Sequence, residues 1–255
     1  MKEFVSMKAW QEERGRYVGQ KVGFVPTMGA LHAGHASLLE RARAENDVVA
    51  LSIYVNPTQF NNPLDLERYP ITIDKDRELA RSRNVDVLLL PRFEEIYSDN
   101  YRYKVSEGVF SNQLCGAHRP GHFDGVLTVV LKLLNLVQPH RVYFGEKDFQ
   151  QLQLIRGMVE TFFLPIEVIA CETKRENDGL AMSSRNVNLS PEARRVAPSL
   201  YRILNEAPTP QAARELLSVN GFDVDYVEDI VDSKSTRRFA AATLGGVRLI
   251  DNVSR

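Results

Sequence analysis

Apolar runs of strand length alternate with segments of helical periodicity over the first two thirds of the chain. Residues 21–26 (KVGFVP) are mostly apolar, which predicts a buried strand, and residues 35–46 (HASLLERARAEN) place apolar side chains on one helical face. Residues 47–56 (DVVALSIYVN) are rich in valine and isoleucine, which predicts the next strand. These three segments form a βαβ unit, whose right-handed crossover implies parallel strands.

The same alternation continues as far as residue 171. Helices are predicted over 74–83, 125–137 and 148–162, and strands over 84–91, 141–145 and 166–171. This order predicts an α/β fold, a Rossmann-like open and mostly parallel sheet with helices on both faces. In such sheets, ligands bind beyond the carboxyl ends of the strands.

The pattern changes after a polar segment over 173–190. Residues 190–207 (SPEARRVAPSLYRILNEA) have a helical pattern, with Ser190 as N-cap and Pro191 at the first helical position. Two strands are expected near 224–231 and 238–253. We therefore expect a large Rossmann-like domain over 1–188 and a small α+β C-terminal lid domain over 189–255.

Composition narrows the classes of function. The 255 residues carry a net charge of −1, so no polybasic surface favours nucleic acid or an anionic membrane as partner. Cys115 and Cys171 lie far apart, which indicates neither a disulfide framework nor a zinc ribbon. The charged start of the chain does not resemble a signal peptide, and no apolar run approaches the roughly 20 residues of a membrane span. A cytoplasmic protein is therefore expected.

Two histidines, His32 and His35, lie where the first of these strands is followed by its helix. A helix N-terminus offers unpaired N–H groups and a partial positive charge, so imidazoles there add donors to an anion site. Two other interpretations stay open: the pair could cap the helix, or it could supply two ligands of a metal site, for which no third and fourth ligand is evident.

A second loop, AMSSRN (181–186), carries side chains that suit phosphate. Ser183 and Ser184 offer hydroxyl donors, and Arg185 offers a planar, permanently charged fork. The His-x-Gly-His pattern resembles the HIGH motif of the nucleotidyltransferase superfamily, and this loop resembles the KMSKS loop that accompanies it. An ordinary serine-rich turn before a helix is the alternative.

Amide and cationic side chains follow two other strands. Asn56 and Gln59 follow the strand over 47–56, and amides orient hydroxyls and carboxylates without adding charge. Lys147 follows the strand over 141–145 together with Gly145, at the start of a predicted helix. Gln151 lies one helical turn after Lys147 and so on the same face. Lys147 could also be an ordinary surface lysine.

Five blocks together resemble the pantothenate synthetase (pantoate–β-alanine ligase) family. They span residues 24–190 in the family's order: FVPTMGALHAGHASLL, SIYVNPTQF, RPGHFDGVLTVVLKLLNLVQP, YFGEKDFQQLQLIR and DGLAMSSRNVNLS. The resemblance implies an ATP-dependent condensation of pantoate with β-alanine to pantothenate, in coenzyme A biosynthesis. It implies a pantoyl-adenylate intermediate, release of pyrophosphate and AMP, magnesium that accompanies ATP, and a homodimer.

The resemblance also implies the roles of single residues. It makes His32, His35 and Lys147 catalytic, because they would stabilise charge at the ATP phosphates. The full set of ATP contacts that it implies is Met28, Gly29, His32, His35, Gly145, Lys147, Asp148, Met182, Ser183, Ser184 and Arg185. The substrate contacts that it implies are Gln59, Gln151, Asn56 and Phe60. It implies a weaker role for Arg119 and His122 near the entrance of the site, and it assigns no metal ligand and no general base.

The chain departs from this family in two places. Ile71 stands where the family usually has an arginine, and the stretch over 206–222 is shorter than the usual helical segment, which predicts a smaller lid. Asp76 is a faint candidate for an outer contact to magnesium.

Three other functions compete with that of a pantoate–β-alanine ligase. A nucleotidyltransferase with a phosphorylated acceptor would share the histidines but would not need Gln59 and Gln151. A catalytically silent nucleotide-binding protein would not need an intact set of phosphate-binding residues. An aminoacyl-tRNA synthetase is disfavoured because the chain has no anticodon domain and no basic surface.

Overall fold

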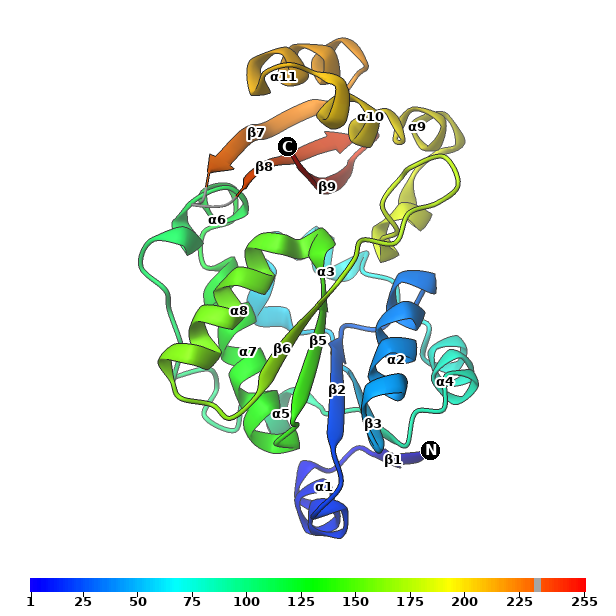
Figure 1. The fold of residues 1–255 in the computed structure, drawn as a ribbon, viewed down its shortest axis with the longest axis vertical. Helices are drawn as coiled ribbons and strands as arrows, with labels where there is room; N and C mark the ends of the chain where they lie inside the picture. The colour runs from blue at the N-terminus through cyan, green and yellow to red at the C-terminus, as the bar shows by residue number, and fades with distance from the viewer. Residues whose placement is uncertain (232–234) are drawn as a thin grey trace.

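The computed structural model describes residues 1–231 and 235–255, which form two sheets (Figure 1). The larger sheet has six strands in the order β1-β4-β3-β2-β5-β6, and all of its pairings are parallel. The smaller sheet has three antiparallel strands in the order β7-β8-β9. This arrangement confirms the predicted Rossmann-like sheet with a small α+β C-terminal part.

The large sheet is built from short elements. Its strands are β1 (Lys2–Phe4), β2 (Val22–Thr27), β3 (Val48–Ile53), β4 (Val87–Leu89), β5 (Arg141–Gly145) and β6 (Glu167–Cys171). The α-helices before β6 are α1 (Met7–Arg14), α2 (Ala33–Glu45), α3 (Pro63–Glu67), α4 (Ile73–Ser82), α5 (Phe93–Ile96), α6 (Cys115–His118), α7 (His122–Val137) and α8 (Phe149–Thr161). Short 3₁₀ turns include η1 (Gly15–Tyr17), η2 (Pro57–Gln59), η3 (Phe110–Asn112), η4 (Glu146–Asp148) and η5 (Ser184–Asn188).

Helices cover both faces of the large sheet, as predicted. On one face, α2 and α4 contribute Leu38, Leu39 and Ala80 to a core with Val25 and other strand residues. On the other face, α1, α7 and α8 enclose a larger core that includes Trp10 and Leu127. Because both faces are buried, the strands read as continuous apolar runs rather than alternating ones.

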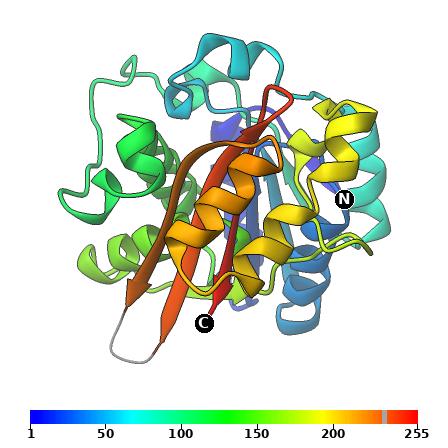
Figure 2. The same cartoon turned by 90° about the horizontal axis from the view of Figure 1, so that it is seen from above.

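The C-terminal part contains α9 (Pro191–Val196), α10 (Ser199–Glu206), α11 (Pro210–Val219), β7 (Asp223–Val231), β8 (Thr236–Leu244) and β9 (Val247–Ser254). Figure 2 shows its helices lying over the small sheet. Tyr226, Phe239 and Ala241 of this sheet belong to the main core. The small sheet is therefore docked on the large part, while the domain boundary after residue 188 stays a prediction.

Several elements differ from the sequence-based expectation. The helix expected over 190–207 is two helices, because the chain breaks at Ala197 and Pro198, although Ser190 caps the first as predicted. The strand expected over 238–253 is a hairpin, since Gly245 and Gly246 adopt positive φ and turn the chain. Elements β1, α1, α3, α5, α6 and α11 were not predicted. Among the described residues, none of the helices has the length and apolar character needed to span a bilayer.

Candidate active site

Two cavities lie beyond the carboxyl ends of β2, β3 and β5. The first, of about 220 Å³, is lined by His32 and His35 and is called the histidine cavity here. The second, of about 130 Å³, is lined by Arg119, Arg185 and Arg248 and is called the arginine cavity. The two cavities share a wall made of Met28, Gln59, Lys147, Asp148, Gln151, Ser183 and Arg185.

Most of the predicted site residues meet in the histidine cavity. Those that line it are Met28, His32, His35, Asn56, Gln59, Gly145, Lys147, Asp148, Gln151, Met182, Ser183, Ser184 and Arg185. Phe60 lines the arginine cavity instead. Gly29 lines neither cavity: it is buried against Ile53 and Asp76 with φ +79°. Predicted site residues from four separate segments of the chain therefore converge on one cavity.

The two histidines cap α2 and also face the cavity. His32 Nδ1 accepts a hydrogen bond from the Gly34 N–H at 3.1 Å, and His35 Nδ1 accepts one from the His32 N–H at 3.3 Å. The capping interpretation is thus correct, and it fixes the tautomer: an accepting Nδ1 leaves the proton of a neutral imidazole on Nε2. Each ring can then donate one N–H to a ligand.

Both imidazoles are neutral at physiological pH. Burial, reinforced by the charge of Lys147, lowers the pKa of His32 to about 4. Burial and the neighbouring His32 and Lys147 lower the pKa of His35 to about 3. The site therefore offers an anion two neutral N–H donors from the histidines, and Lys147 supplies the formal charge beside them.

Gly34 is required because the His32 ring folds back over it. A Cβ at position 34 would lie 2.8 Å from His32 Cε1 and 2.9 Å from Nδ1. We expect Gly34→Ala to displace this ring and to lower exchange of pyrophosphate into ATP, the reaction that the family resemblance implies, by about tenfold or more, because misplaced donors lose transition-state stabilisation. The free energy of unfolding should change by less than about 1 kcal/mol, since alanine favours the helix by a similar amount.

Gly157→Ala is the matched control for Gly34→Ala. Gly157 lies in α8, and a methyl group there would meet nothing in the described chain outside its own neighbours and helix backbone. Its exchange rate should equal that of the wild type. Equal rates for both alanine variants would show that the His32 ring position has no catalytic consequence.

The second predicted loop is tied to the first. The Ser184 hydroxyl donates to the Ala30 carbonyl at 3.1 Å, and this carbonyl lies between the end of β2 and His32. Arg185 makes a two-pronged ion pair with Asp65, at 3.2 Å from Nε and 3.0 Å from Nη2. No hydrogen bond from Arg185 Nη1 occurs within the described residues, so this nitrogen can donate to a ligand while the ion pair persists.

The amides differ in how far their hydrogen bonds are satisfied. Asn56 is 1% exposed, and its amide bonds to Gly125, Gln59, Thr58 and Tyr97. It therefore holds the loop in shape, and its contact with an adenylate stays a prediction. In the described part of the chain, Gln59 Nε2 donates to one acceptor, the Met28 sulfur at 3.2 Å, which is a weak acceptor. Gln151 has no hydrogen bond from its side chain among the described residues and can turn to a ligand.

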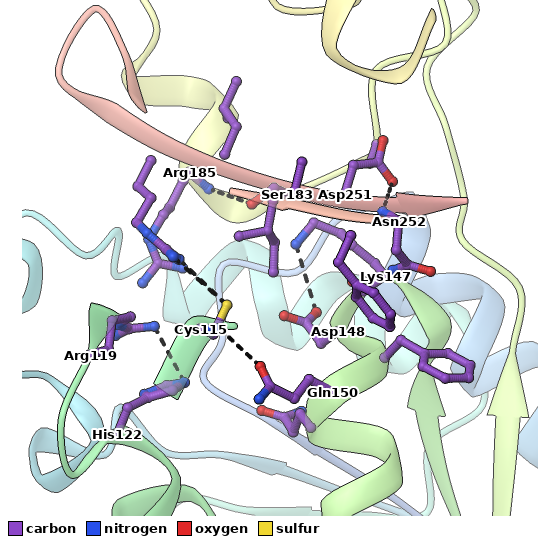
Figure 3. Close-up of a pocket in the computed structure, with 18 of the residues that line it drawn as sticks. Cys115, Arg119, His122, Lys147, Asp148, Gln150, Ser183, Arg185, Asp251 and Asn252 are labelled. Atoms are coloured by element: carbon purple, nitrogen blue, oxygen red, sulfur yellow. Dashed lines mark hydrogen bonds and ion pairs between the residues drawn. The ribbon is translucent and has the colours of Figure 1, made fainter. Parts of the chain in front are cut away.

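Figure 3 shows the arginine cavity, which sequence reasoning largely missed. Arg119 hydrogen-bonds to Asn61 and to the Gln59 carbonyl, and its nearest carboxylate is Asp65 at 4.0 Å. Burial and repulsion by Arg185 and Arg248 lower the pKa of Arg119 to about 10. The cavity thus holds more positive charge than its own carboxylates balance, which favours an anionic ligand.

Some of these residues carried no local sequence signal. Asp65 pairs with Arg185 across 120 positions of the chain, so only the fold brings the two together. Arg248 lies on β9, beyond all of the predicted phosphate-binding loops. Arg248 sits at the predicted tail, where its Asp225 partner at 2.7 Å also lies. The "HRPGHF" block did point to Arg119, so only the family resemblance could have found this cavity.

His122 provides a pH-dependent test of the site. Its Nδ1 donates to the Gln59 carbonyl at 2.8 Å, and Nε2 lies 3.3 Å from Arg119 Nη1 and accepts from it. Burial, together with the charge of Arg119, lowers the pKa of His122 to about 3. Because the folded-state pKa lies below the unfolded value of about 6.5, the unfolded state binds more protons below pH 6.5. Acid therefore destabilises the fold.

We expect His122 to contribute about 2 kcal/mol to the loss of unfolding free energy between pH 7.5 and 5.0, at 1.36 kcal/mol per pH unit. In His122→Asn, the amide N–H can replace Nδ1–H as donor to Gln59, but the titrating group is gone. Urea unfolding of both proteins at the two pH values measures this. The loss for the variant should be smaller by that amount, and equal losses would show that His122 is not held neutral.

Asp76, the faint candidate for a magnesium contact, has another role. Its carboxylate is 2% exposed and accepts from the backbone N–H groups of Ala30 and Leu31, at 3.0 and 2.8 Å. Thr72 donates to the same carboxylate. Asp76 therefore fixes the loop before His32, and an outer contact of Asp76 to magnesium stays a prediction. No cluster of three or more potential metal-ligating side chains occurs in residues 1–231 and 235–255.

The fold and the site define a class of protein. Neutral imidazoles lie at the start of α2 beside a parallel α/β sheet. The loop that carries Ser184 and Arg185 is bonded to the chain just before them, and the turn that carries Lys147 lines the same cavity. This is the arrangement of a HIGH-type nucleotidyltransferase. The family profile "Pantoate-beta-alanine ligase" matches residues 1–254. The chain belongs to the pantoate–β-alanine ligase family, and the predicted enzyme class is confirmed.

Named relatives cover nearly the whole chain. Pantothenate synthetase of Bdellovibrio bacteriovorus is 56% identical over 246 residues, 96% of this chain and 95% of that protein. Pantothenate synthetase of Legionella pneumophila is 50% identical over 91% of this chain and 90% of its own length. The crystal structure of pantoate-β-alanine ligase from Francisella tularensis, complexed with β-γ ATP and β-alanine, has a TM-score of 0.95 and 41% identity. It matches 100% of this chain and 97% of that one.

Proposed function

We propose that the histidine cavity activates pantoate with ATP and that the arginine cavity delivers β-alanine to the product of that step. The observation that carries the proposal is the convergence of the two phosphate-binding loops, joined by the Ser184–Ala30 hydrogen bond, beside the amides of Gln59 and Gln151. One cavity thus combines hydrogen-bond donors for phosphate with amides that can bind an acid. This combination suits a reaction between a nucleoside triphosphate and a small hydroxy acid.

The first step needs donors aimed at phosphate. A carboxylate is a poor electrophile, so pantoate attacks the α-phosphorus of ATP, and pyrophosphate leaves as pantoyl adenylate forms. Negative charge builds up on the phosphate oxygens, where His32 and His35 present Nε2–H donors and Lys147 presents its ammonium group. Ser183 and Arg185 hold the outgoing pyrophosphate, while the Ser184 hydroxyl keeps their loop bonded to the Ala30 carbonyl. Gln59 exchanges its weak sulfur contact for a pantoate oxygen.

The second step joins β-alanine to the activated acyl carbon. The amine attacks that carbon, the bond to the AMP oxygen breaks, and pantothenate and AMP result. With an amine pKa of about 10, only about one molecule in a thousand is the free base at pH 7, equivalent to roughly 4 kcal/mol. Holding amine and adenylate together contributes about 7–11 kcal/mol, so positioning outweighs this term without a dedicated base.

Magnesium, assembly and location complete the proposal. Mg²⁺ would enter with the phosphates of ATP, and Asp148, which lines the same cavity 3.7 Å from the Lys147 ammonium, is a carboxylate that could contact it. A homodimer and a cytoplasmic location are carried over from the family. Ile71, which stands where the family usually has an arginine, is 78% exposed just before α4 and brings no charge to this position. A smaller lid remains our prediction.

Exchange of labelled pyrophosphate into ATP tests the proposed function. Exchange that depends on pantoate supports the ligase, because only adenylate formation is reversed by pyrophosphate. Exchange that depends instead on a phosphorylated acceptor would favour the rival nucleotidyltransferase. ATP binding without exchange in the presence of any acid would favour the silent nucleotide-binding protein.

Arg119 gives a separate test of the second step. Because its charge has no close carboxylate partner, we place the β-alanine carboxylate beside it. Arg119→Ala should raise the KM for β-alanine by about 10–100-fold, the value of a charge-assisted hydrogen bond, and leave pantoate-dependent exchange within a few-fold of wild type. Steady-state kinetics with β-alanine as the varied substrate measure this. An unchanged KM would place the β-alanine carboxylate elsewhere.

A further inference from the structure

The small sheet contacts the turn that carries Lys147. Asn252, on β9, donates its amide N–H groups to two consecutive carbonyls of this turn, those of Glu146 at 2.9 Å and Lys147 at 3.0 Å. Its Oδ1 accepts from Arg237 Nη1 at 2.6 Å. Carbonyls accept only and a guanidinium donates only, so these neighbours allow one orientation of the amide. Asn252 is 5% exposed, and water does not compete for these bonds.

The strands around Asn252 hold it rigidly against the turn. Arg237 stacks over the Phe149 ring at 3.9 Å, directly after the turn, and Phe149 packs on Phe239 of β8 at 6.0 Å. Asp251, which precedes Asn252 in β9, forms a two-pronged ion pair with Arg175, at 2.6 and 2.9 Å. Figure 3 shows Asp251 and Asn252 on one strand next to Lys147, which lies in the turn before α8.

We propose that Asn252 is a positioning residue, through which the small sheet sets the backbone of the Lys147 turn and so the aim of the Lys147 ammonium group. The inference rests on the proposed function, because it requires Lys147 to act on the reacting phosphate. Without the two donors, buried carbonyls lose their partners and the peptide planes on both sides of the Lys147 Cα are free to rotate. A displacement of about 1 Å at a reacting group costs about 10²-fold in rate.

Asn252→Asp is the sharpest variant, because it keeps the shape of the side chain and its contact with Arg237 but has no N–H donors. We expect pantoate-dependent pyrophosphate exchange to fall by about 10–100-fold in the wild-type background. In a Lys147→Ala background, the same change should cost less than threefold, since no ammonium group remains to be aimed. If Asn252→Asp does not fold, Asn252→Ala tests the same bonds without charge repulsion.

The inference is decided by a ratio: the fold-loss of exchange that Asn252→Asp causes in the wild-type background, divided by the fold-loss that it causes in the Lys147→Ala background. A ratio above threefold supports it, and a ratio of threefold or less overturns it, including the case in which the variant is as active as wild type. Normal exchange by Lys147→Ala alone would instead refute the proposed role of Lys147, and the inference with it. Asn205→Asp is the control, because this exposed amide donates to the Tyr201 carbonyl at 2.9 Å, away from both cavities, and should leave exchange unchanged.

Discussion

Lys147→Ala is expected to lower pantoate-dependent pyrophosphate exchange by about 10²–10³-fold while the protein remains folded. The side chain is 18% exposed and lies in the wall shared by both cavities, and its one ion-pair partner among the residues that the structure describes is Asp148, at 3.7 Å. Loss of one well-aimed donor to developing charge costs roughly 3–4 kcal/mol of transition-state stabilisation. Because negative charge on the phosphate oxygens increases on the way to the transition state, the effect should fall more on kcat than on the KM for ATP.

Single-turnover formation of pyrophosphate from ATP and pantoate measures this loss directly. Lys75→Ala, on the exposed surface of α4, is the matched control and should react at the wild-type rate. Thermal unfolding of both variants separates a catalytic effect from a loss of stability. A rate for Lys147→Ala within threefold of wild type would contradict its assignment as a catalytic residue.

The sequence predicted the large sheet well because buried parallel strands leave a strong signal. Helices cover both faces of these strands, so β2, β3 and β5 are continuous apolar runs followed by polar loops. The same feature located the site, since the loops after parallel strands converge at one edge of the sheet. The four-residue spacing from Lys147 to Gln151 correctly placed both side chains in the shared wall.

The rest depended on contacts that no local pattern encodes. Strand β1 has three residues and is defined by its pairing with β4, 85 positions along the chain from Lys2 to Val87. Asp65 gains its role only when the fold brings it to Arg185, and Asp76 only when its carboxylate meets the loop before His32. The neutral state of the histidines depends on burial and on Lys147, which sequence spacing does not reveal.

The two roles of His35, helix cap and phosphate donor, should separate in a pair of variants. Its Nδ1 accepts from the His32 N–H, which leaves Nε2–H as the donor for a ligand in the cavity that His35 lines. In His35→Asn, the amide oxygen can take the position of Nδ1, so the cap persists but the cavity donor is lost. In His35→Gln, the longer amide can present an N–H near the position of Nε2, so the donor persists but the cap is lost.

We therefore expect opposite outcomes for activity and stability. His35→Asn should lower pyrophosphate exchange by about 10²–10³-fold. Because the cap persists, the unfolding free energy should change by less than the roughly 1 kcal/mol that the loss of one cap costs. His35→Gln should keep exchange within about tenfold of wild type and lose about 1 kcal/mol of stability. Exchange rates and urea unfolding measure the two properties. If activity followed the cap rather than the donor, His35 would act by shaping the start of α2, and the charge on the phosphates would have to be met by Lys147 and Arg185.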